Sequence, residues 1–545
     1  MNETVVETKT CLHCQSSFDI TQWDLDFYNK ISPAFAGQKF QIPTPTLCPD
    51  CRQRRRLSFR NERKLYRRIC DATQQPIISI YSPDKPHKVY DQKTRRSDSR
   101  DPMDYGFEFD FGKNFTENFR ELMIRVPHCS ILNINSQNSD YTNICANNKN
   151  CYMLVESSNN EDCYYWYRLQ KSSDCVDCSM VNDSQNCYEG VDLDDCYWVY
   201  YSHYCRWCSH WFLLEDCVSC SFCFGCVGLE NEQYMIFNQQ ATKEEYDSIV
   251  TLFLWWDEGQ KNEIIIKWKS LKPVSWVQHV RNSENTTGDY IYDAANIKQS
   301  HEIHDAKDVS YSRHVRFNSG NCIDVDTVGY NSFWMYESIN TALDANHNSF
   351  CMRCWSGCNN LLYCFNCDSC SDCFSCIWLR NKQYCIFNKQ YSKEEYEIQV
   401  PKIIAHMIAT GERGEFFHPS LSPFGYNETV AQEYYPLSAV GASLASPDNG
   451  QDKSWPYVNF ADHGYHRSSY EAPAPHSDKV INWEDLPDII TEVQDSILQY
   501  AIKCEVTGKL FRIQAQELAF YRKHNIPLPR KHPDQRHLER LALRK

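Results

Sequence analysis

Four cysteines near the start of the chain have the residue type and spacing of a metal site. Cys11 and Cys14 form one C-x2-C pair, and Cys48 and Cys51 form a second. Four thiolates fill all four tetrahedral positions of Zn²⁺, which leaves no open coordination position for a substrate or an activated water. We therefore predict one structural zinc ion at these cysteines, with further zinc ions left open, and no chemistry at the metal.

A basic run follows the second cysteine pair directly. Residues 52 to 68 contain nine Arg or Lys and one acidic residue, Glu62, in a chain whose net charge is −15. On a helix fixed by zinc, such a run can contact the phosphates of RNA or DNA. Equally, it can pair with acidic residues elsewhere in the same chain. The residues assigned to nucleic-acid binding under the first interpretation are Arg54, Arg55, Arg56, Arg60, Arg63, Lys64, Arg67 and Arg68, to which the C-terminal Arg530, Lys531, Arg536, Arg540, Arg544 and Lys545 could add.

Signals of catalysis are weak. The sequence has no G-x-x-x-x-G-K-[ST], no G-x-G-x-x-G and no G-x-S-x-G, and His301 and His304 are too close for the H-E-x-x-H zinc motif. A solenoid groove can carry carboxylates that cleave polysaccharides, but acidic turn residues are the expected reading of Asp192, Asp194, Asp195, Asp324 and Asp326. No catalytic residue is predicted, and a binding protein is expected rather than an enzyme.

The two ends of the chain repeat each other. The segment from Cys11 aligns with the segment from Cys504, and the segment from Ile42 aligns with that from Ile526. In the C-terminal copy only Cys504 and His532 remain as weak metal candidates. Because two ligands rarely hold a structural zinc, we expect the same small fold without metal or with a weak site.

A third, degenerate version lies between the two ends. Cys70, Thr73, Asp91 and Thr94 have a spacing like that of a zinc ribbon, but three of the four ligand positions are lost. We expect a metal-free β-hairpin here, with inward-facing isoleucines.

The middle of the chain carries a second repeat. All thirteen cysteines from Cys145 to Cys226 fall in one register of three, and similar units start twelve residues apart at Asn150, Asp162 and Asp174. A short strand and a turn at constant spacing predict a parallel β-solenoid, in which equivalent positions stack at about 4.8 Å. The pattern returns after residue 289. Whether one coil contains one unit or two, and its handedness, stay open.

Both solenoid halves end in the same way. The segment from Ser219 matches the segment from Ser369, at an offset of 150 residues. Thr242 and Ser392 precede Lys-Glu-Glu at the spacing of helix N-caps. We therefore expect each half to close with a cap and a helix.

The cysteines inside the solenoid admit three interpretations. Their C-x2-C spacing differs from that of a ferredoxin cluster, because the last gap has two residues and no proline follows. Extra zinc sites require four converging thiols. We favour ladders of small buried side chains. The densest runs are Cys217, Cys220, Cys223 and Cys226, and Cys364, Cys367, Cys370, Cys373 and Cys376.

These observations together predict a mainly β fold. A parallel β-helix-like solenoid in two blocks is flanked by small zinc-ribbon or treble-clef-like modules at both ends. The predicted parts are a zinc module with a basic helix (1–69), a degenerate hairpin and helix (70–126), solenoid block 1 (127–240), a helical excursion (241–284), solenoid block 2 (285–391), a helix and cap (392–437), a linker (438–480) and a degenerate treble-clef-like module (481–545).

The thirty cysteines also bear on the compartment. The start MNETVVETKT has no apolar signal segment, and no stretch is long enough to cross a membrane. We therefore expect a cytoplasmic protein with reduced thiols and no membrane partner.

Several strings carry a resemblance. The four-cysteine module resembles a zinc-ribbon or treble-clef domain. CPDCRQRRRLSFRNERKLYRR, IISIYSPDKP, YMIFNQQATKEEY and FYRKHNIPLPRKHPDQRH resemble a family of uncharacterised cysteine-rich zinc-ribbon proteins predicted from uncultivated bacteria. Relatives carry a second complete cysteine quartet where this chain has Cys70, Thr73, Asp91 and Thr94. The resemblance implies no activity.

Two functions follow as hypotheses. The first is a zinc-binding cytosolic scaffold whose solenoid presents Tyr, Trp and Asn to a protein or glycan partner. The alternative is an RNA- or DNA-binding zinc protein that acts through residues 52 to 68. For the first, the competing interpretation is that the aromatic residues pack between coils; those concerned are Tyr164, Tyr165, Trp166, Tyr197, Trp198, Tyr200 and Tyr201.

Overall fold

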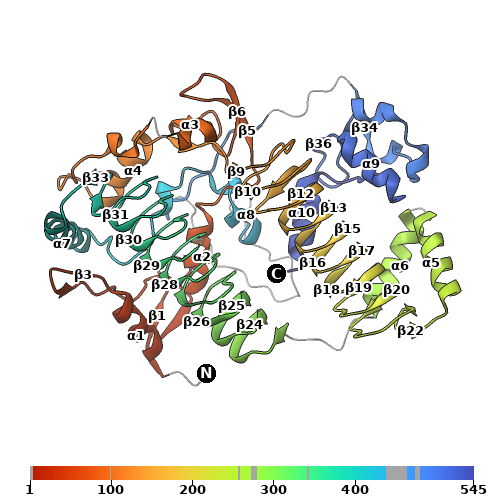
Figure 1. Cartoon of the computed structure of the whole chain (residues 1–545), viewed down its shortest axis with the longest axis horizontal. Helices are drawn as coiled ribbons and strands as arrows, with labels where there is room; N and C mark the ends of the chain where they lie inside the picture. The colour runs from red at the N-terminus through yellow and green to blue at the C-terminus, as the bar shows by residue number, and fades with distance from the viewer. Residues whose placement is uncertain are drawn as a thin grey trace. The chain divides into compact units, whose positions relative to one another are not determined.

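Parallel coils of a β-solenoid occupy the middle of the chain. The computed structural model describes residues 4–97, 100–255, 258–271, 279–340, 343–436, 463–472 and 479–544. About 20 solenoid turns lie across residues 133–386 (Figure 1). The chain divides into two compact units, Met1–Ser130 with Val277–Ser469, and Ile131–Trp276 with Tyr470–Lys545. Each unit combines one solenoid block with one end of the chain, so the predicted mainly β fold with two solenoid blocks is confirmed.

Left-handed residues at every third position shape the coils. In one coil Asn150, Met153, Glu156 and Asn159 have φ between 50° and 59°. Asn and Asp enter this backbone region more readily than other side chains apart from glycine. This explains why Asn or Asp precedes each cysteine at the start of a repeat: the left-handed residue turns the chain, and the following cysteine points inward.

Solenoid block 1 has twelve residues per coil. Cys163 pairs with Cys175, and Leu169 pairs with Val181, in parallel ladders. One twelve-residue unit is therefore one coil. The strands are β9 (Asn133–Ile134), β10 (Cys145–Ala146), β11 (Tyr152–Val155), β12 (Glu161–Gln170), β13 (Ser173–Val176), β14 (Ser179–Asn182), β15 (Gln185–Tyr188), β16 (Val191–Asp194), β17 (Tyr197–Tyr200), β18 (His203–Arg206), β19 (Ser209–Glu215), β20 (Ser221–Val227), β21 (Met235–Ile236) and β22 (Gln239–Gln240).

Solenoid block 2 has coils of more than one length. Ile291 pairs with Ile303, twelve residues on, whereas Val309 pairs with Cys322 and Cys322 with Met335, thirteen residues on. The extra residue explains why the repeat is harder to see here in the sequence. The strands are β23 (Val280–Arg281), β24 (Glu284–Tyr292), β25 (Ala295–His304), β26 (Ala306–Ser310), β27 (Ser319–Ile323), β28 (Phe333–Tyr336), β29 (Asn346–Ser349), β30 (Asn359–Leu362), β31 (Ser371–Phe374), β32 (Cys385–Ile386) and β33 (Lys389–Gln390).

The solenoid interior is lined with thiols. All thirty cysteines of the chain are buried. A typical example, Cys376 Sγ, lies 3.4 Å from the carbonyl oxygen of Phe374 and 3.3 Å from that of Cys385. Burial raises the pKa of Cys145 and of Cys322 to about 12, so these two groups stay protonated thiols. This arrangement is the one expected of small buried side chains that make weak hydrogen bonds.

Each block ends in a two-stranded antiparallel hairpin and a helix. The hairpins are β21–β22 and β32–β33. Ser392 Oγ accepts a hydrogen bond from Glu395 N (3.1 Å), and Thr242 Oγ1 accepts one from Glu245 N (3.2 Å). Both predicted N-caps are therefore confirmed. The helices are α5 (Lys243–Trp255) and α6 (Glu258–Ser270) after block 1, and α7 (Lys393–Ala409) after block 2.

The terminal segments of the two units contain the remaining elements. In the unit that holds block 2 they are β1 (Val5–Thr10), β2 (Ser17–Thr21), α1 (Gln22–Ile31), β3 (Ala34–Phe35), β4 (Gln38–Lys39), α2 (Pro49–Leu57), β5 (Tyr66–Ile69), β6 (Pro76–Ser79), β7 (Val89–Tyr90), α3 (Gln92–Arg96), η1 (Pro102–Tyr105), α4 (Phe115–Arg125), β8 (His128–Cys129), η2 (Pro419–Leu421), η3 (Tyr426–Glu428) and α8 (Val430–Tyr434). In the unit that holds block 1 they are β34 (Val480–Asn482), η4 (Trp483–Asp485), η5 (Ile490–Glu492), η6 (Asp495–Gln499), β35 (Ala501–Lys503), β36 (Leu510–Phe511), α9 (Ala515–Lys523) and α10 (Pro533–Ala542).

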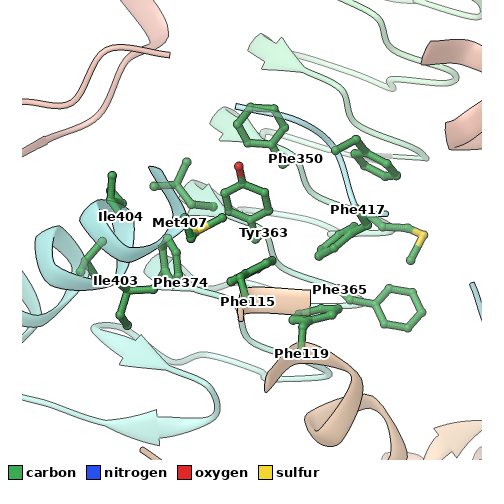
Figure 2. Close-up of a cluster of buried hydrophobic side chains, with 14 of the residues drawn as sticks. Phe115, Phe119, Phe350, Tyr363, Phe365, Phe374, Ile403, Ile404, Met407 and Phe417 are labelled. Atoms are coloured by element: carbon green, nitrogen blue, oxygen red, sulfur yellow. The ribbon is translucent and has the colours of Figure 1, made fainter. Parts of the chain in front are cut away.

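An aromatic core joins α4 and α7 to the outer side of block 2. Figure 2 shows Phe115 and Phe119 of α4 beside solenoid residues and Met407 of α7. The rings of Phe119 and Phe417 stack with centroids 4.6 Å apart, and Phe115 lies 5.0 Å from Tyr363. The helices thus cover apolar solenoid residues that would otherwise face water.

The predicted linker, residues 438 to 480, lies mostly outside the described residues. Its described residues are 463–472 and 479–480. In the first of these stretches Tyr465 is buried, and Ser468 N donates to Asn427 Oδ1 over 2.8 Å. Among the helices that the structure describes, none is long and apolar enough to cross a membrane.

Candidate metal centre

The four predicted zinc ligands come together in one buried cluster. The sulfur atoms of Cys11, Cys14, Cys48 and Cys51 all lie within 4.8 Å of one another, and those of Cys14 and Cys48 are 3.5 Å apart. A tetrahedral zinc with Zn–S bonds of about 2.3 Å requires sulfur atoms about 3.8 Å apart. The cluster can therefore hold a metal ion with small adjustments.

Two local structures position these thiols. Cys11 N donates to Ser16 O (2.9 Å) and Gln15 N donates to Cys11 O (3.0 Å), which closes a tight turn with Gln15 at φ 61°. Cys48 is the N-cap of α2, and Pro49 occupies the first turn of the helix. Proline suits this position because the first helical N–H groups lack partners within the helix. We call the tight turn from Cys11 to Ser16 the knuckle. The knuckle and the start of α2 thus face each other across the cluster.

The thiols of the cluster share their protons unequally. Hydrogen bonds from Cys48 and Cys51 hold the pKa of Cys11 well below its usual range. The hydrogen bond to Cys11 in turn raises the pKa of Cys48 to about 12. A bound metal would replace the shared protons, because metal-ligating cysteines are thiolates.

The same knuckle occurs twice more without a complete ligand set. Cys70 N donates to Gln75 O and Cys504 N donates to Lys509 O, each over 2.9 Å. The residues at the position of Gln15 are Gln74 and Gly508, with φ of 57° and 66°. The repeats read from the sequence therefore correspond to three copies of one local structure.

In the copy at Cys70, a hydrogen bond stands where a metal would bind. Cys70 Sγ lies 3.4 Å from Asp91 Oδ2, and Asp91 Oδ1 accepts from Thr94 N over 2.9 Å at the start of α3. Of the isoleucines expected to face inward, Ile80 is buried, and Ile77 and Ile78 are half-buried.

The weak candidates Cys504 and His532 have other hydrogen-bonding partners. Burial acts to raise the pKa of Cys504, but hydrogen bonds from Thr507 and from the His532 backbone outweigh burial and lower this pKa. His532 Nδ1 accepts from Asp534 N over 3.1 Å and caps α10. Among the described residues, only the cluster of Cys11, Cys14, Cys48 and Cys51 brings three or more metal-ligating side chains together, and the solenoid cysteines form no such group.

The arginines of α2 point into their own unit. Arg52 Nε lies 2.6 Å from Asp324 Oδ2, and Arg56 Nη1 lies 3.5 Å from Asp324 Oδ1. Arg55 binds Glu337 on the solenoid and Glu415, each over 2.7 Å. Asp324 and Glu337 belong to turns of block 2, so ion pairs hold α2 on the solenoid.

Half of the residues assigned to nucleic-acid binding are thereby buried. Arg54, Arg55, Arg56 and Arg60 are each at most 4% exposed. Arg54 stacks over Tyr465, and Arg60 pairs with Glu62. Of the others, Arg63, Lys64 and Arg68 are half-buried and Arg67 is exposed.

The C-terminal copy docks on block 1 in the same manner. Arg536 and Arg540 of α10 both bind Asp177, the second over 3.2 Å, and Arg540 Nη1 lies 3.1 Å from Glu189 Oε2. Arg544 binds Asp192 over 3.2 Å. The intramolecular alternative for the basic runs is what the structure shows at these residues.

These contacts also place some of the carboxylates considered for catalysis. Asp324 and Asp326 are buried beneath α2, and Asp192 pairs with Arg544. Sequence reasoning missed Asp177, Glu189 and Glu337 as docking partners. A usable signal was present: Arg52 and Arg56 align with Arg536 and Arg540, four residues apart in both copies.

Comparisons with known proteins give no further guide. No protein-family model matches the chain, no curated protein matches it, and no solved structure matches it. The function must therefore be argued from the geometry alone.

Proposed function

We propose that this protein is a zinc-stabilised solenoid scaffold that binds partners through exposed solenoid surface in the cytoplasm. The observation that carries the proposal is the position of the four-cysteine cluster at the start of α2. Arginines of the same helix form ion pairs with carboxylates of block 2; they are Arg52, Arg55 and Arg56. A closed four-thiolate site supports a structural role for the ion.

Zinc would stabilise a helix that is weak by itself. The helix α2 has nine residues, with charged side chains through most of its length. Isolated helices shorter than about 12 residues are marginal in water. Four zinc–thiolate bonds would tie its first turn to the knuckle at Cys11 and so align its arginines with Asp324 and Glu337. Membership of the cysteine-rich zinc-ribbon family stays part of this proposal.

The solenoid supplies the interaction surface, although not through most of the aromatic residues first considered. Tyr164, Tyr165, Trp166 and Tyr200 are buried, as in the packing interpretation. Tyr197 and Trp207 of block 1, and Tyr330 of block 2, are each 42% exposed or more. Rigid, exposed rings of this kind make contacts at a low entropy cost.

The structure gives less support to nucleic-acid binding. Phosphate contacts require accessible cations, and four of the eight assigned residues are buried in pairs or stacks within the unit. The remaining four assigned residues lie between Arg63 and Arg68, and the chain as a whole has a net charge of −15. We therefore favour the scaffold.

Elemental analysis of anaerobically purified protein tests the proposal. We expect about one zinc per chain, lost in the Cys11→Ser/Cys14→Ser variant and retained in matched Cys70→Ser and Cys504→Ser variants. Absence of zinc from the wild-type protein, or iron that persists in the double variant, would contradict a single structural zinc. Retrieval of partners from a cytosolic extract with and without nuclease then separates protein or glycan partners from nucleic acid.

A further inference from the structure

One face of block 2 contains an open groove of about 790 Å³ that extends across successive coils. Its floor includes Ala295 and Gly320, and Phe333 lies at one end. The ladder Ala295–Lys307–Gly320–Phe333 connects these residues coil by coil. We call this feature the ladder groove.

Small floor residues give the groove its depth. A Cβ atom at Gly320 would lie 2.3 Å from the carbonyl oxygen of Lys307, so the coil spacing itself requires glycine there. Two coils before Gly320, Ala295 also has a small side chain. One coil after Gly320, the side chain of Phe333 closes that end of the groove.

Polar ladders form the two walls. On one wall Asn282 Nδ2 donates to Asp293 Oδ1 over 3.1 Å. On the other wall, Asp308 and Asn321 line the groove, and Asp308 Oδ1 accepts from Asn296 Nδ2 over 2.8 Å. A carboxamide has two N–H donors, and each of these bonds uses one of them. The walls therefore offer both donors and carboxylate acceptors to a ligand, at regular intervals along the solenoid.

Two stacked aromatic rings lie next in sequence to the asparagines that continue the first wall, although they are not themselves among the residues that line the groove. The rings of Phe317 and Tyr330 lie 4.5 Å apart and are nearly parallel, with an angle of 9° between them. They are 38% and 48% exposed. Phe317 immediately precedes Asn318, which lines the groove. Tyr330 immediately precedes Asn331, whose Oδ1 accepts from Asn318 Nδ2 over 2.9 Å.

We infer that the ladder groove binds a linear, uncharged oligosaccharide. Sugar hydroxyls are donors and acceptors that match the amides and carboxylates of the walls, and the apolar face of a pyranose ring fits an aromatic ring. Four carboxylates line the groove, those of Glu284, Asp293, Asp305 and Asp308, against one cation, Lys307. This excess of negative charge repels phosphate, sulfate and uronate polymers. Coils stack about 4.8 Å apart, so the same contacts recur along a polymer of similar repeat length.

The open shape also favours a polymer over a small compound. Sites for small molecules enclose most of the ligand surface, whereas the ladder groove follows several coils and is open to solvent. This inference deepens the proposed scaffold function by naming the ligand class of the solenoid, but the groove uses none of the zinc ligands.

Calorimetric titration with three neutral probes, cellohexaose, mannohexaose and chitohexaose, tests the inference. We expect saturable binding of at least one probe, and no binding of polygalacturonate or polyuridylate. Ala295→Trp, which fills the groove, and Tyr330→Ala, which removes an exposed ring, should each weaken binding about tenfold or more. Tyr197→Ala, which removes an exposed ring in the other unit, is the matched control and should leave the affinity unchanged.

Circular dichroism and thermal melting establish that each variant is folded. Because Tyr330 is an exposed side chain, its variant reports on binding even if Ala295→Trp distorts a coil. Three results would overturn the inference: no neutral probe binds, the groove variants bind as the wild type does, or only the anionic polymers bind. A wild-type protein without zinc that still binds a hexasaccharide would refute the zinc-stabilised scaffold and leave the ladder groove standing.

Discussion

Arg52 and Asp324 form a buried ion pair, 2.6 Å from Nε to Oδ2, between residues 272 positions apart in the chain. Asp324 also contacts Arg56, one helical turn further along α2. In the other unit Asp177 contacts Arg536 and Arg540 in the same arrangement. In each unit, therefore, one aspartate of the solenoid lies between two arginines that are four residues apart. These ion pairs fix each terminal module to its solenoid block.

The first prediction concerns the aspartates of these buried ion pairs. Asp324→Asn leaves two buried guanidinium groups with a neutral partner, and removal of one member of a buried ion pair destabilises a protein by about 3 to 5 kcal/mol. We expect the variant to lower the free energy of unfolding of the unit that contains block 2. Asp177→Asn should do the same to the unit that contains block 1. Urea denaturation followed by hydrogen exchange within each unit measures both effects.

A matched control for this prediction is Glu108→Gln. Glu108 pairs with Lys389 at the surface of the same unit as Asp324. Exposed ion pairs contribute little to stability, so the change should be small. Equal effects of Asp324→Asn and Glu108→Gln would show that the buried pairs do not fix α2.

The second prediction concerns metal removal. Chelation of the ion, or Cys14→Ser, should lower the free energy of unfolding of the unit with block 2 by more than about 3 kcal/mol, because zinc binding and the folding of small modules are coupled. Cys70→Ser alters only weak hydrogen bonds of the Cys70 thiol, with Asp91 Oδ2 and with the N–H groups of Thr73 and Asp91, each worth about 1 kcal/mol or less. Denaturation with and without chelator measures the difference. If chelation has no effect on the first unit, or affects both units alike, the four-cysteine cluster is not a structural metal site.

Local signals allowed much of the architecture to be predicted from the sequence. Residue type and spacing predict the cluster of Cys11, Cys14, Cys48 and Cys51, which could hold a metal ion, and the convergence of these side chains needs only a hairpin and a helix start. The solenoid was visible because each coil requires a left-handed residue such as Asp162 before an inward cysteine. Both signals arise within one repeat.

Long-range pairing could not be predicted in the same way. Arg55 meets Glu337 across 282 positions, and nothing local distinguishes that glutamate from an exposed one in a turn. The ladder groove depends on Ala295 and Gly320 falling on one face, which requires the mixture of twelve- and thirteen-residue coils seen in block 2. Local charge suggested phosphate binding for eight residues, and the tertiary structure buries four of them.

The third prediction concerns pH. Burial raises the pKa of Glu517 to about 7, although Arg536 lies 3.7 Å away, whereas an unfolded glutamate titrates near 4.3. Between about pH 4.5 and 7 the folded state therefore binds more protons than the unfolded state, and the free energy of unfolding falls as pH rises through this window. The whole contribution is at most about 4 kcal/mol.

Glu517→Gln tests this dependence. The hydroxyl groups of Tyr165 and Tyr521 donate to Oε2 and Oε1 of Glu517 over 2.9 and 2.8 Å. Gln keeps one of these two acceptors and the shape of the side chain, but it does not titrate. The unit with block 1 should become less sensitive to pH and more stable at pH 7 and above. Denaturation from pH 4.5 to 8 provides the measurement, with the exposed Glu484→Gln as control. An unchanged slope in Glu517→Gln would assign the pH dependence to another group.

The fourth prediction concerns the left-handed turns of the coils. Asp195 is exposed and has φ of 50°. A β-branched side chain is strained there by about 1 to 2 kcal/mol, whereas glycine adopts this conformation without strain. Asp195→Val should therefore destabilise the unit with block 1, and Asp195→Gly should change its stability much less. If valine is tolerated as well as glycine in urea denaturation, the coil does not need a left-handed residue at this position, and the explanation for Asn or Asp before each cysteine fails.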